Sequence, residues 1–124
     1  MITIINPSKE KPYVRLIELY KIALKEKQRN IEAFVVSSFS NTANEVNSRC
    51  VNLKFIDGKD LIFFSNYNSP KASDFEEHPQ ISGILYWNKL DKQIRIKGSI
   101  KRTSKKYNQK YFESRDPKKN ALAI

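Results

Sequence analysis

The chain has 124 residues, enough for one hydrophobic core but short of the size at which chains usually divide, so a single domain is expected over residues 1–124. Its composition, 40% hydrophobic and 11% aromatic with only three glycines, excludes a disordered or fibrous chain. The formal net charge is +10, and residues 89–119 contribute twelve Lys or Arg minus three Asp or Glu, a net of +9. This asymmetry predicts either an anionic partner (a nucleic acid, a phosphorylated small molecule or an acidic protein) or simply a solvated basic face.

The start of the chain, MITIINPSKEKPY, lacks a basic segment followed by a long apolar run, so it does not read as a secretory signal. No stretch reaches the roughly 18 apolar residues of a membrane span. A cytoplasmic protein with no membrane partner is therefore expected. A single cysteine and a single histidine form no disulfide and no zinc spacing, so no metal is expected.

An amphipathic helix is predicted over residues 12–28. Pro12 suits its first turn, and apolar residues recur close to helical spacing at Val14, Ile17, Leu19, Tyr20, Ala23 and Leu24. The apolar run AFVVSSFS, residues 33–40, then predicts a buried strand. The polar segment NTANEVN, residues 41–47, is expected to turn the chain.

A β-hairpin is predicted next, from a strand over residues 49–56 and a returning strand over residues 61–66, joined at the Asp57-Gly58 turn signal. Strand alternation places Val51, Leu53 and Phe55 on one face. By the same parity Arg49 and Lys54 point to opposite faces, unless a β-bulge or a curled edge brings both to one ligand.

The second half of the chain predicts a short helix from Ser69, a strand pair over residues 80–87 and 92–102, and a helix over residues 104–116. The second strand of the pair alternates an apolar face (Ile94, Ile96, Ile100) with a polar one (Gln93, Arg95, Lys97). Together these elements predict a mainly β fold with flanking helices, in which an antiparallel sheet over residues 31–102 curls into a small barrel.

Candidate binding residues include Lys71 in the first turn of the Ser69 helix, where backbone N–H groups and the helix dipole favour an anion. Tyr111 and Arg115 share one face of the last helix and could offer a hydroxyl and a guanidinium to one phosphate, although residues at such spacing are more often core. No nucleotide-binding or hydrolase motif is present, and no catalytic residue is assigned. His78 precedes a proline, where a helix-ending role is favoured, and Cys50 is interpreted as a packed small residue.

The residues from Arg49 to Arg115 resemble the pyridoxamine 5′-phosphate oxidase family of FMN enzymes. RCVNLK is similar to the family's R-x-V-L-L-K, FFSN to F-Y-T-N, SPK to S-R-K, LDKQIRIKG to L-x-R-Q-V-x-x-x-G and YFESR to Y-F-x-S-R-P, in the family's order and without an obvious gap. The resemblance implies an antiparallel split β-barrel that dimerises and binds FMN at the subunit interface.

The resemblance also implies roles for single residues. FMN would be held by residues 49–54 (Arg49, Cys50, Val51, Asn52, Leu53 and Lys54) together with Phe64, Ser65, Lys71 and Gln93. The substrate, pyridoxamine or pyridoxine 5′-phosphate, would contact Lys54, Tyr111 and Arg115. The implied reaction is FMN-dependent oxidation to pyridoxal 5′-phosphate with O₂ as the acceptor, a step of vitamin B6 metabolism. The flavin carries the redox chemistry, so the part of the protein is to position the ligands and to provide charged groups.

Departures from the family pattern are expected to matter. Pro70 replaces the arginine of S-R-K, and Lys119 stands where the family has a serine. The family's C-terminal region is expected to be missing, so activity could be impaired by truncation or completed by another polypeptide. The alternatives are an FMN-binding protein with another redox role and, from a different class, a small basic β-barrel that binds nucleic acid.

Overall fold

The computed structural model describes residues 1–66, 77–103 and 119–123. The helices predicted from Ser69 and over residues 104–116 fall outside these residues. Within them lie one α-helix, α1 (Lys11–Lys25), and one 3₁₀ turn, η1 (Asn88–Leu90). The strands are β1 (Thr3–Ile5), β2 (Ala33–Ser40), β3 (Glu45–Asp57), β4 (Asp60–Asn66), β5 (Gln80–Trp87), β6 (Lys92–Ser99), β7 (Lys101–Arg102) and β8 (Lys119–Ala123).

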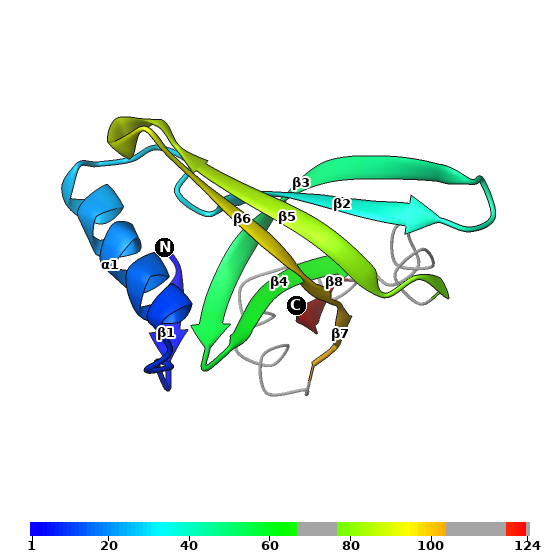
Figure 1. The fold of residues 1–124 in the computed structure, drawn as a ribbon, viewed down its shortest axis with the longest axis horizontal. Coiled ribbons are helices and arrows are strands. Elements are labelled where there is room, and N and C mark those ends of the chain that lie inside the picture. The colour runs from blue at the N-terminus through cyan, green and yellow to red at the C-terminus, as the bar shows by residue number, and fades with distance from the viewer. Residues whose placement is uncertain (67–76, 104–118, 124) are drawn as a thin grey trace.

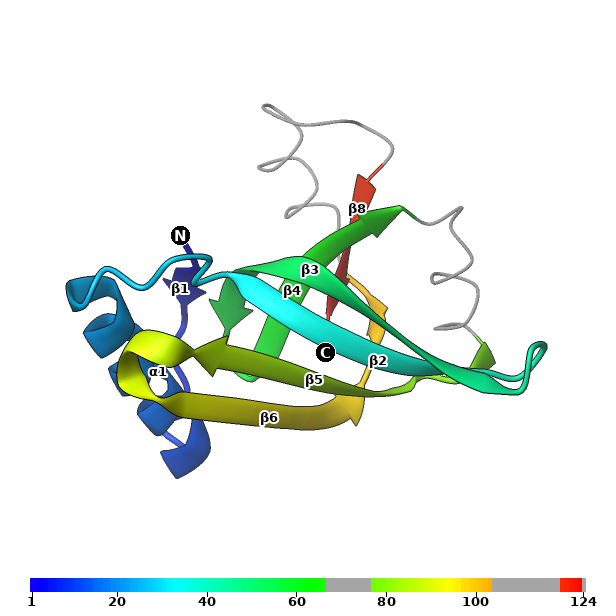
Figure 2. The same ribbon diagram turned by 90° about the horizontal axis from the view of Figure 1, so that it is seen from above.

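The strands form one strongly curled sheet in the order β6-β5-β2-β3-β4-β8-β7, with β1 added to β3 (Figures 1 and 2). The two ends of this order, β6 and β7, are separated in the chain only by Ile100, but they are not paired with one another. The backbone N–H of Ile100 instead donates to the carbonyl of Pro79 at 2.8 Å. The sheet therefore curls toward a barrel without closing.

Two strands agree with the sequence prediction to the residue, β2 and β5. β3 begins at Glu45 rather than at residue 49, because Glu45, Val46 and Asn47 pair with Ser40, Phe39 and Ser38 of β2. The predicted turn over residues 41–47 is thus shorter. The hairpin turn at Gly58 is confirmed, and its φ of +60° is a conformation that glycine adopts without strain.

The sequence reading missed β1 and β8. β1 pairs with β3 in parallel, and it lies outside the antiparallel barrel that was predicted over residues 31–102. A segment of three residues was too short to indicate a strand, and only the partner β3 reveals it. β8 lies between β4 and β7 and carries Lys119 in the sheet.

Helix α1 covers one end of the curled sheet with four buried residues, Leu16, Leu19, Tyr20 and Ala23. Their i, i+3, i+4, i+7 spacing is one helical stripe. The wider stripe predicted from the sequence was partly wrong, because Val14 and Leu24 at its margins are 39% and 37% exposed. Tyr20 packs against Trp87, and the Trp87 indole N–H donates to the carbonyl of Ile31 at 3.0 Å. These contacts fix the helix to the start of β2 and the end of β5.

The core is divided into two clusters by a β-bulge in β3. Leu53 pairs with Phe63 and Phe55 with Ile62, which leaves Lys54 as the extra residue. The side chains of Leu53 and Ile56 consequently lie in the main core, whereas Phe55 packs with Ile62 and Phe64 in a second cluster. The prediction that Val51, Leu53 and Phe55 share one face is therefore wrong for Phe55, since the bulge shifts the strand alternation by one residue.

Candidate functional site

Strands β3 and β4 part from one another at the pair Leu53–Phe63. Beyond this pair β3 runs back to Glu45 alongside β2, while β4 runs on to Asn66 alongside β8. We call the region between these two arms, residues 45–53 of β3 and 63–66 of β4, the β3–β4 fork (Figure 2). Beyond the pair Leu53–Phe63, β3 and β4 do not pair with one another among the described residues. A strand edge presents backbone N–H and C=O groups, which a ligand can use.

The fork brings together both strand segments that the sequence assigned to a cofactor, residues 49–54 on β3 and residues 64–65 on β4. Arg49 is exposed and lies in the same alternating row as Val51 and Leu53. Cys50 and Asn52, also exposed, belong to the opposite row, so the interpretation of Cys50 as a packed small residue is wrong. Val51 is half-buried against the main core and Leu53 is completely buried. The arm thus offers one accessible guanidinium and a strand edge.

Two of the candidates are buried in the core, so a ligand could reach only their backbone. The backbone N–H of Leu53 already donates to the carbonyl of Glu32 at 2.8 Å. Phe64 is 7% exposed and packs edge-to-face on Phe55, with ring centroids 6.3 Å apart. Ser65 follows in β4, opposite Asn120 of β8.

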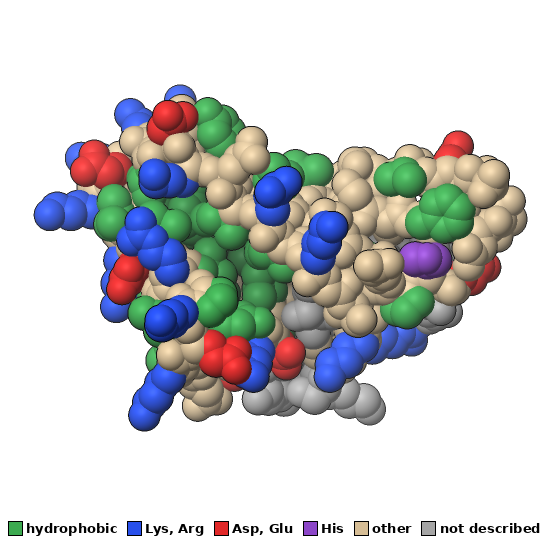
Figure 3. Space-filling model, viewed as in Figure 1, with side chains coloured by type: hydrophobic (Ala, Val, Ile, Leu, Met, Phe, Trp, Pro, Cys, Tyr) green, Lys and Arg blue, Asp and Glu red, His purple; other side chains and the backbone are tan. Residues whose placement is uncertain are grey.

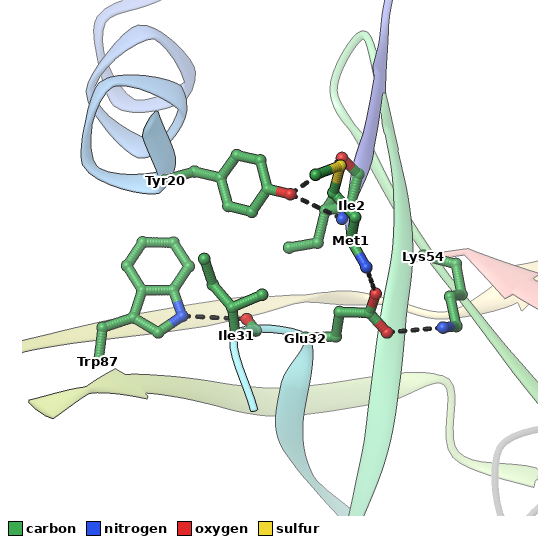
Figure 4. A network of polar contacts seen from close by, with 7 residues as sticks. All are labelled: Met1, Ile2, Tyr20, Ile31, Glu32, Lys54 and Trp87. Atoms are coloured by element: carbon green, nitrogen blue, oxygen red, sulfur yellow. Dashed lines mark hydrogen bonds and ion pairs between the residues drawn. The ribbon is translucent and has the colours of Figure 1, made fainter. Parts of the chain in front are cut away.

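Lys54 lies at the bulge and is held by a carboxylate. Its Nζ donates to Oε2 of Glu32 at 2.6 Å, and the side chains of Lys54 and Glu32 are only 19% and 14% exposed (Figure 4). The other oxygen of Glu32, Oε1, makes an ion pair with the amine of Met1. Burial, and to a smaller extent the positive charge of Lys54, lowers the pKa of the Met1 amine. One carboxylate therefore holds two cations beside the fork.

Gln93 is not brought to the fork within one chain. It is exposed on β6 opposite Tyr86, and β5 and β2 stand between β6 and β3. Three strand spacings correspond to about 14 Å. The remaining candidates, Lys71, Tyr111 and Arg115, lie outside the described residues.

Glu32 is the residue of this site that the sequence reading missed. It precedes the strand predicted at residue 33, and 22 positions separate it from Lys54. A local motif carries no sign of such a pair. Only the register of β2 on β3, in which Ala33 lies opposite Asn52, places Glu32 beside the bulge.

Apart from the fork, a hollow of about 210 Å³ lies where the end of β2, the start of β5 and the end of β6 meet. The ring of His78 packs edge-to-face on Phe39 there, with centroids 5.5 Å apart, and its buried Nδ1 has no hydrogen-bond partner. The hollow is lined by Ser37, Ser38, Phe39, Val46, His78, Gln80, Ile81, Ser82 and Lys97. Among the described residues, no group of three or more His, Cys, Asp or Glu side chains could hold a metal ion.

The basic side chains of β6 and β7 are exposed, as the alternation of the sequence predicted. Lys92, Arg95, Lys97, Lys101 and Arg102 all reach solvent, whereas Ile94 and Ile96 are half-buried and Ile100 is buried. Lys and Arg side chains are spread over the face drawn in Figure 3 rather than gathered into one stripe. The described part of the chain contains no helix that is long and apolar enough to span a membrane.

The comparisons with known proteins agree on one family. The family model described as pyridoxamine 5′-phosphate oxidase matches residues 21–124. A pyridoxine/pyridoxamine 5′-phosphate oxidase of Rhodopirellula baltica is 31% identical over 111 residues, which cover 89% of this chain and 50% of that protein. The chain spans about half the length, or less, of the curated relatives that it matches.

Two solved structures illustrate the likeness of the fold. PhzG from Burkholderia lata, in complex with tetrahydrophenazine-1-carboxylic acid, has a TM-score of 0.77 at 25% identity, over 85% of this chain and 52% of that one. A pyridoxamine 5′-phosphate oxidase-related, FMN-binding protein from Nostoc punctiforme has a TM-score of 0.72 at 11% identity, over 94% of this chain and 81% of that one. The predicted mainly β, split-barrel fold is confirmed.

Proposed function

Because the chain belongs to the pyridoxamine 5′-phosphate oxidase family, we propose that it binds FMN in the β3–β4 fork and takes part in oxidising pyridoxamine or pyridoxine 5′-phosphate to pyridoxal 5′-phosphate. The observation that carries this proposal is the fork itself. It unites the two strand segments assigned to FMN at the point where β3 and β4 part from one another.

The donor set of the fork fits a phosphorylated flavin. The exposed guanidinium of Arg49 suits a phosphate, which arginine binds through two parallel N–H groups. The ammonium of Lys54 keeps two of its three N–H donors after its bond to Glu32, and these suit acceptor atoms of a ring or a substrate. Strand edges of β3 and β4 supply backbone groups. Leu53 and Phe64, whose side chains are buried, would contribute through the backbone.

The flavin, when bound, supplies the redox chemistry of the reaction. The residues of this chain bind and orient. Arg49 and Lys71 would hold the FMN phosphate, and Gln93 would reach the flavin. Lys54, Tyr111 and Arg115 would hold the substrate, the last two through its phosphate. No side chain in this account transfers a proton, in agreement with the lack of a catalytic motif.

We infer a homodimer as the assembled form. On the face of the sheet that carries Cys50, the exposed Val35 and Tyr86 and the half-buried Ile84 lie together, because Val35 pairs with both Cys50 and Ile84. We call this the outer face. Gln93 lies on it too, opposite Tyr86. A second copy packed there would cover these apolar side chains and could bring its Gln93 to the fork of the first.

A second candidate is FMN-dependent oxidation of another anionic, aromatic substrate. It is favoured by the similarity to PhzG, which was solved with tetrahydrophenazine-1-carboxylic acid. This candidate shares the FMN site and the fold, and it differs only in the substrate.

The test is anaerobic reduction of the FMN-loaded chain, followed as bleaching of the flavin absorbance. Pyridoxamine 5′-phosphate should bleach it, and unphosphorylated pyridoxamine should do so far less well. In Lys54→Gln the bleaching should slow, whereas Lys89→Gln, an exposed lysine on η1, serves as the control. An FMN-loaded chain that neither pyridoxamine 5′-phosphate nor pyridoxine 5′-phosphate reduces would contradict the oxidase assignment and leave the second candidate.

A further inference from the structure

Glu32 stands out among the residues near the fork because it neutralises one of its cations. The contact of Lys54 Nζ with Glu32 Oε2 at 2.6 Å is a short, charge-assisted hydrogen bond. Both side chains are more than four-fifths buried, so solvent screens the pair less than it would an exposed one. Figure 4 shows the carboxylate of Glu32 between the Met1 amine and Lys54.

The fold holds Glu32 in this place by its backbone as well. Its carbonyl accepts the N–H of Leu53, the residue before the bulge, so Glu32 is bonded to two successive residues of β3, to Leu53 through its backbone and to Lys54 through its side chain. The neighbouring carbonyl of Ile31 accepts the buried indole N–H of Trp87. The backbone of Glu32 is therefore fixed beside the bulge, just before β2.

We propose that Glu32 is a positioning residue that sets the preference of the fork for anionic over neutral ligands, by orienting Lys54 and cancelling part of its positive charge. This inference rests on the proposed function, since it takes FMN to bind beside Lys54. With Glu32 in place, Lys54 acts mainly as a hydrogen-bond donor. Without the carboxylate, the same ammonium attracts the phosphate of the ligand as a full charge.

The experiment compares FMN with riboflavin, which has the same ring but no phosphate, by titration of flavin fluorescence. In Glu32→Gln, which removes the charge and keeps the size, the Kd of FMN should fall about threefold to tenfold, because one negative charge fewer then stands beside the fork that holds the phosphate. The Kd of riboflavin should change by less than about twofold. Glu26→Gln, an exposed carboxylate at the end of α1 and outside the fork, is the control and should change neither Kd.

Two further variants separate charge from structure. In a Lys54→Gln background, Glu32→Gln should leave the FMN-to-riboflavin ratio unchanged, because the proposed effect passes through Lys54. If Glu32→Gln unfolds at a lower denaturant concentration than the unaltered chain, Glu32→Ser is a second neutral variant. It should show the same shift in the ratio of the FMN Kd to the riboflavin Kd.

The outcomes are distinct. Suppose that the unaltered chain binds FMN. If the ratio of the FMN Kd to the riboflavin Kd in both neutral variants then equals that of the unaltered chain, or if both ligands bind more weakly by the same factor, this inference is overturned while the proposed function stands. If the unaltered chain does not bind FMN, the proposed function fails and the inference fails with it.

Discussion

Tyr20 shows how a single side chain joins the helix to the sheet. Its hydroxyl accepts the backbone N–H of Ile2 at 2.8 Å and donates to the carbonyl of the same residue at 3.2 Å (Figure 4). The side chain is 3% exposed, and its ring packs against Trp87. Tyr20 thus satisfies two backbone groups at the residue just before β1, and it does so from within the core.

Replacing this hydroxyl should destabilise the fold. Tyr20→Phe leaves the two backbone groups of Ile2 without their partner and is expected to lower the free energy of unfolding by about 1–3 kcal/mol. Tyr13→Phe is the control, because the hydroxyl of Tyr13 makes no hydrogen bond among the described residues and its ring also packs against the core. Urea denaturation measures both, and equal stability of the two variants would contradict this role.

The same residue predicts a pH dependence. Burial raises the pKa of Tyr20 above its usual value near 10, an effect only partly offset by the bond to Ile2. A raised pKa means that folding favours the protonated phenol. The contribution of Tyr20 to stability is therefore complete below pH 10 and is lost as the pH rises through the folded-state pKa. Between pH 9 and 11, the urea concentration at the unfolding midpoint should fall more steeply with pH for the unaltered chain than for Tyr20→Phe. Parallel pH curves of the two midpoints would contradict the contribution of the Tyr20 phenol.

Among the elements, β2 and β5 meet at a close contact that explains one glycine. Gly83 lies opposite Val36 at the centre of the sheet, and the ring of Phe34, which is completely buried, occupies the space where a Cβ would stand. Phe34 in turn packs edge-to-face on Phe63 across the core. The glycine makes room for this ring on the neighbouring strand and is not needed for a turn.

Gly83→Ala should destabilise the fold by about 1–3 kcal/mol through overpacking, although alanine ordinarily favours a strand over glycine. Trimming the ring in the double variant Gly83→Ala/Phe34→Leu should cost less than the sum of the two single changes. Ser82→Ala, at the exposed neighbouring position, is the control. Denaturant unfolding of the four variants tests this, and strictly additive effects would contradict the contact.

The bulge in β3 marks the limit of what the sequence could predict about the elements. Periodicity located β2, β5 and the β3–β4 hairpin, because each has an apolar pattern and turn residues of its own. The extra residue at Lys54 arises from the pairing of β3 with β4, and no residue type in RCVNLKFI signals it. Phe55 was therefore assigned to the wrong face, and β1, with three residues, depends on β3 for its existence.

The candidate site, too, could be predicted only in part from the sequence. The resemblance selected residues on both arms of the fork, and their positions on β3 and β4 follow from the strand assignment. Residue patterns could not indicate which of them are accessible. Leu53 and Phe64 are in the core, Arg49 is exposed, and Lys54 is held by Glu32. Pairings across 22 residues follow from strand register, which a single sequence does not specify at a bulge.

For the whole molecule, the outer face predicts the oligomeric state. Val35→Asp places a charge among the exposed apolar side chains of this face and should shift a dimer to monomers, seen by sedimentation velocity. Val14→Asp on α1 is a matched control, since Val14 and Val35 are both 39% exposed. A monomeric unaltered chain, or equal dissociation of both variants, would contradict the proposed interface.

The charge of the whole molecule distinguishes the FMN proposal from the nucleic-acid alternative. A nucleic acid held by many Lys and Arg residues loses affinity steeply with salt, in proportion to the phosphates contacted. A flavin held by one phosphate and by contacts to its ring should depend on salt much less.

The most direct test of the FMN proposal is a titration of the purified chain with FMN, followed by flavin fluorescence and by the visible spectrum at low and high salt. The account predicts saturable binding with a perturbed flavin band, a weak dependence on salt, and an affinity about tenfold or more lower in Arg49→Gln but not in Arg29→Gln, an exposed arginine between α1 and β2. Absence of binding at high micromolar FMN, or identical affinity of both arginine variants, would contradict the β3–β4 fork as a flavin site in this chain.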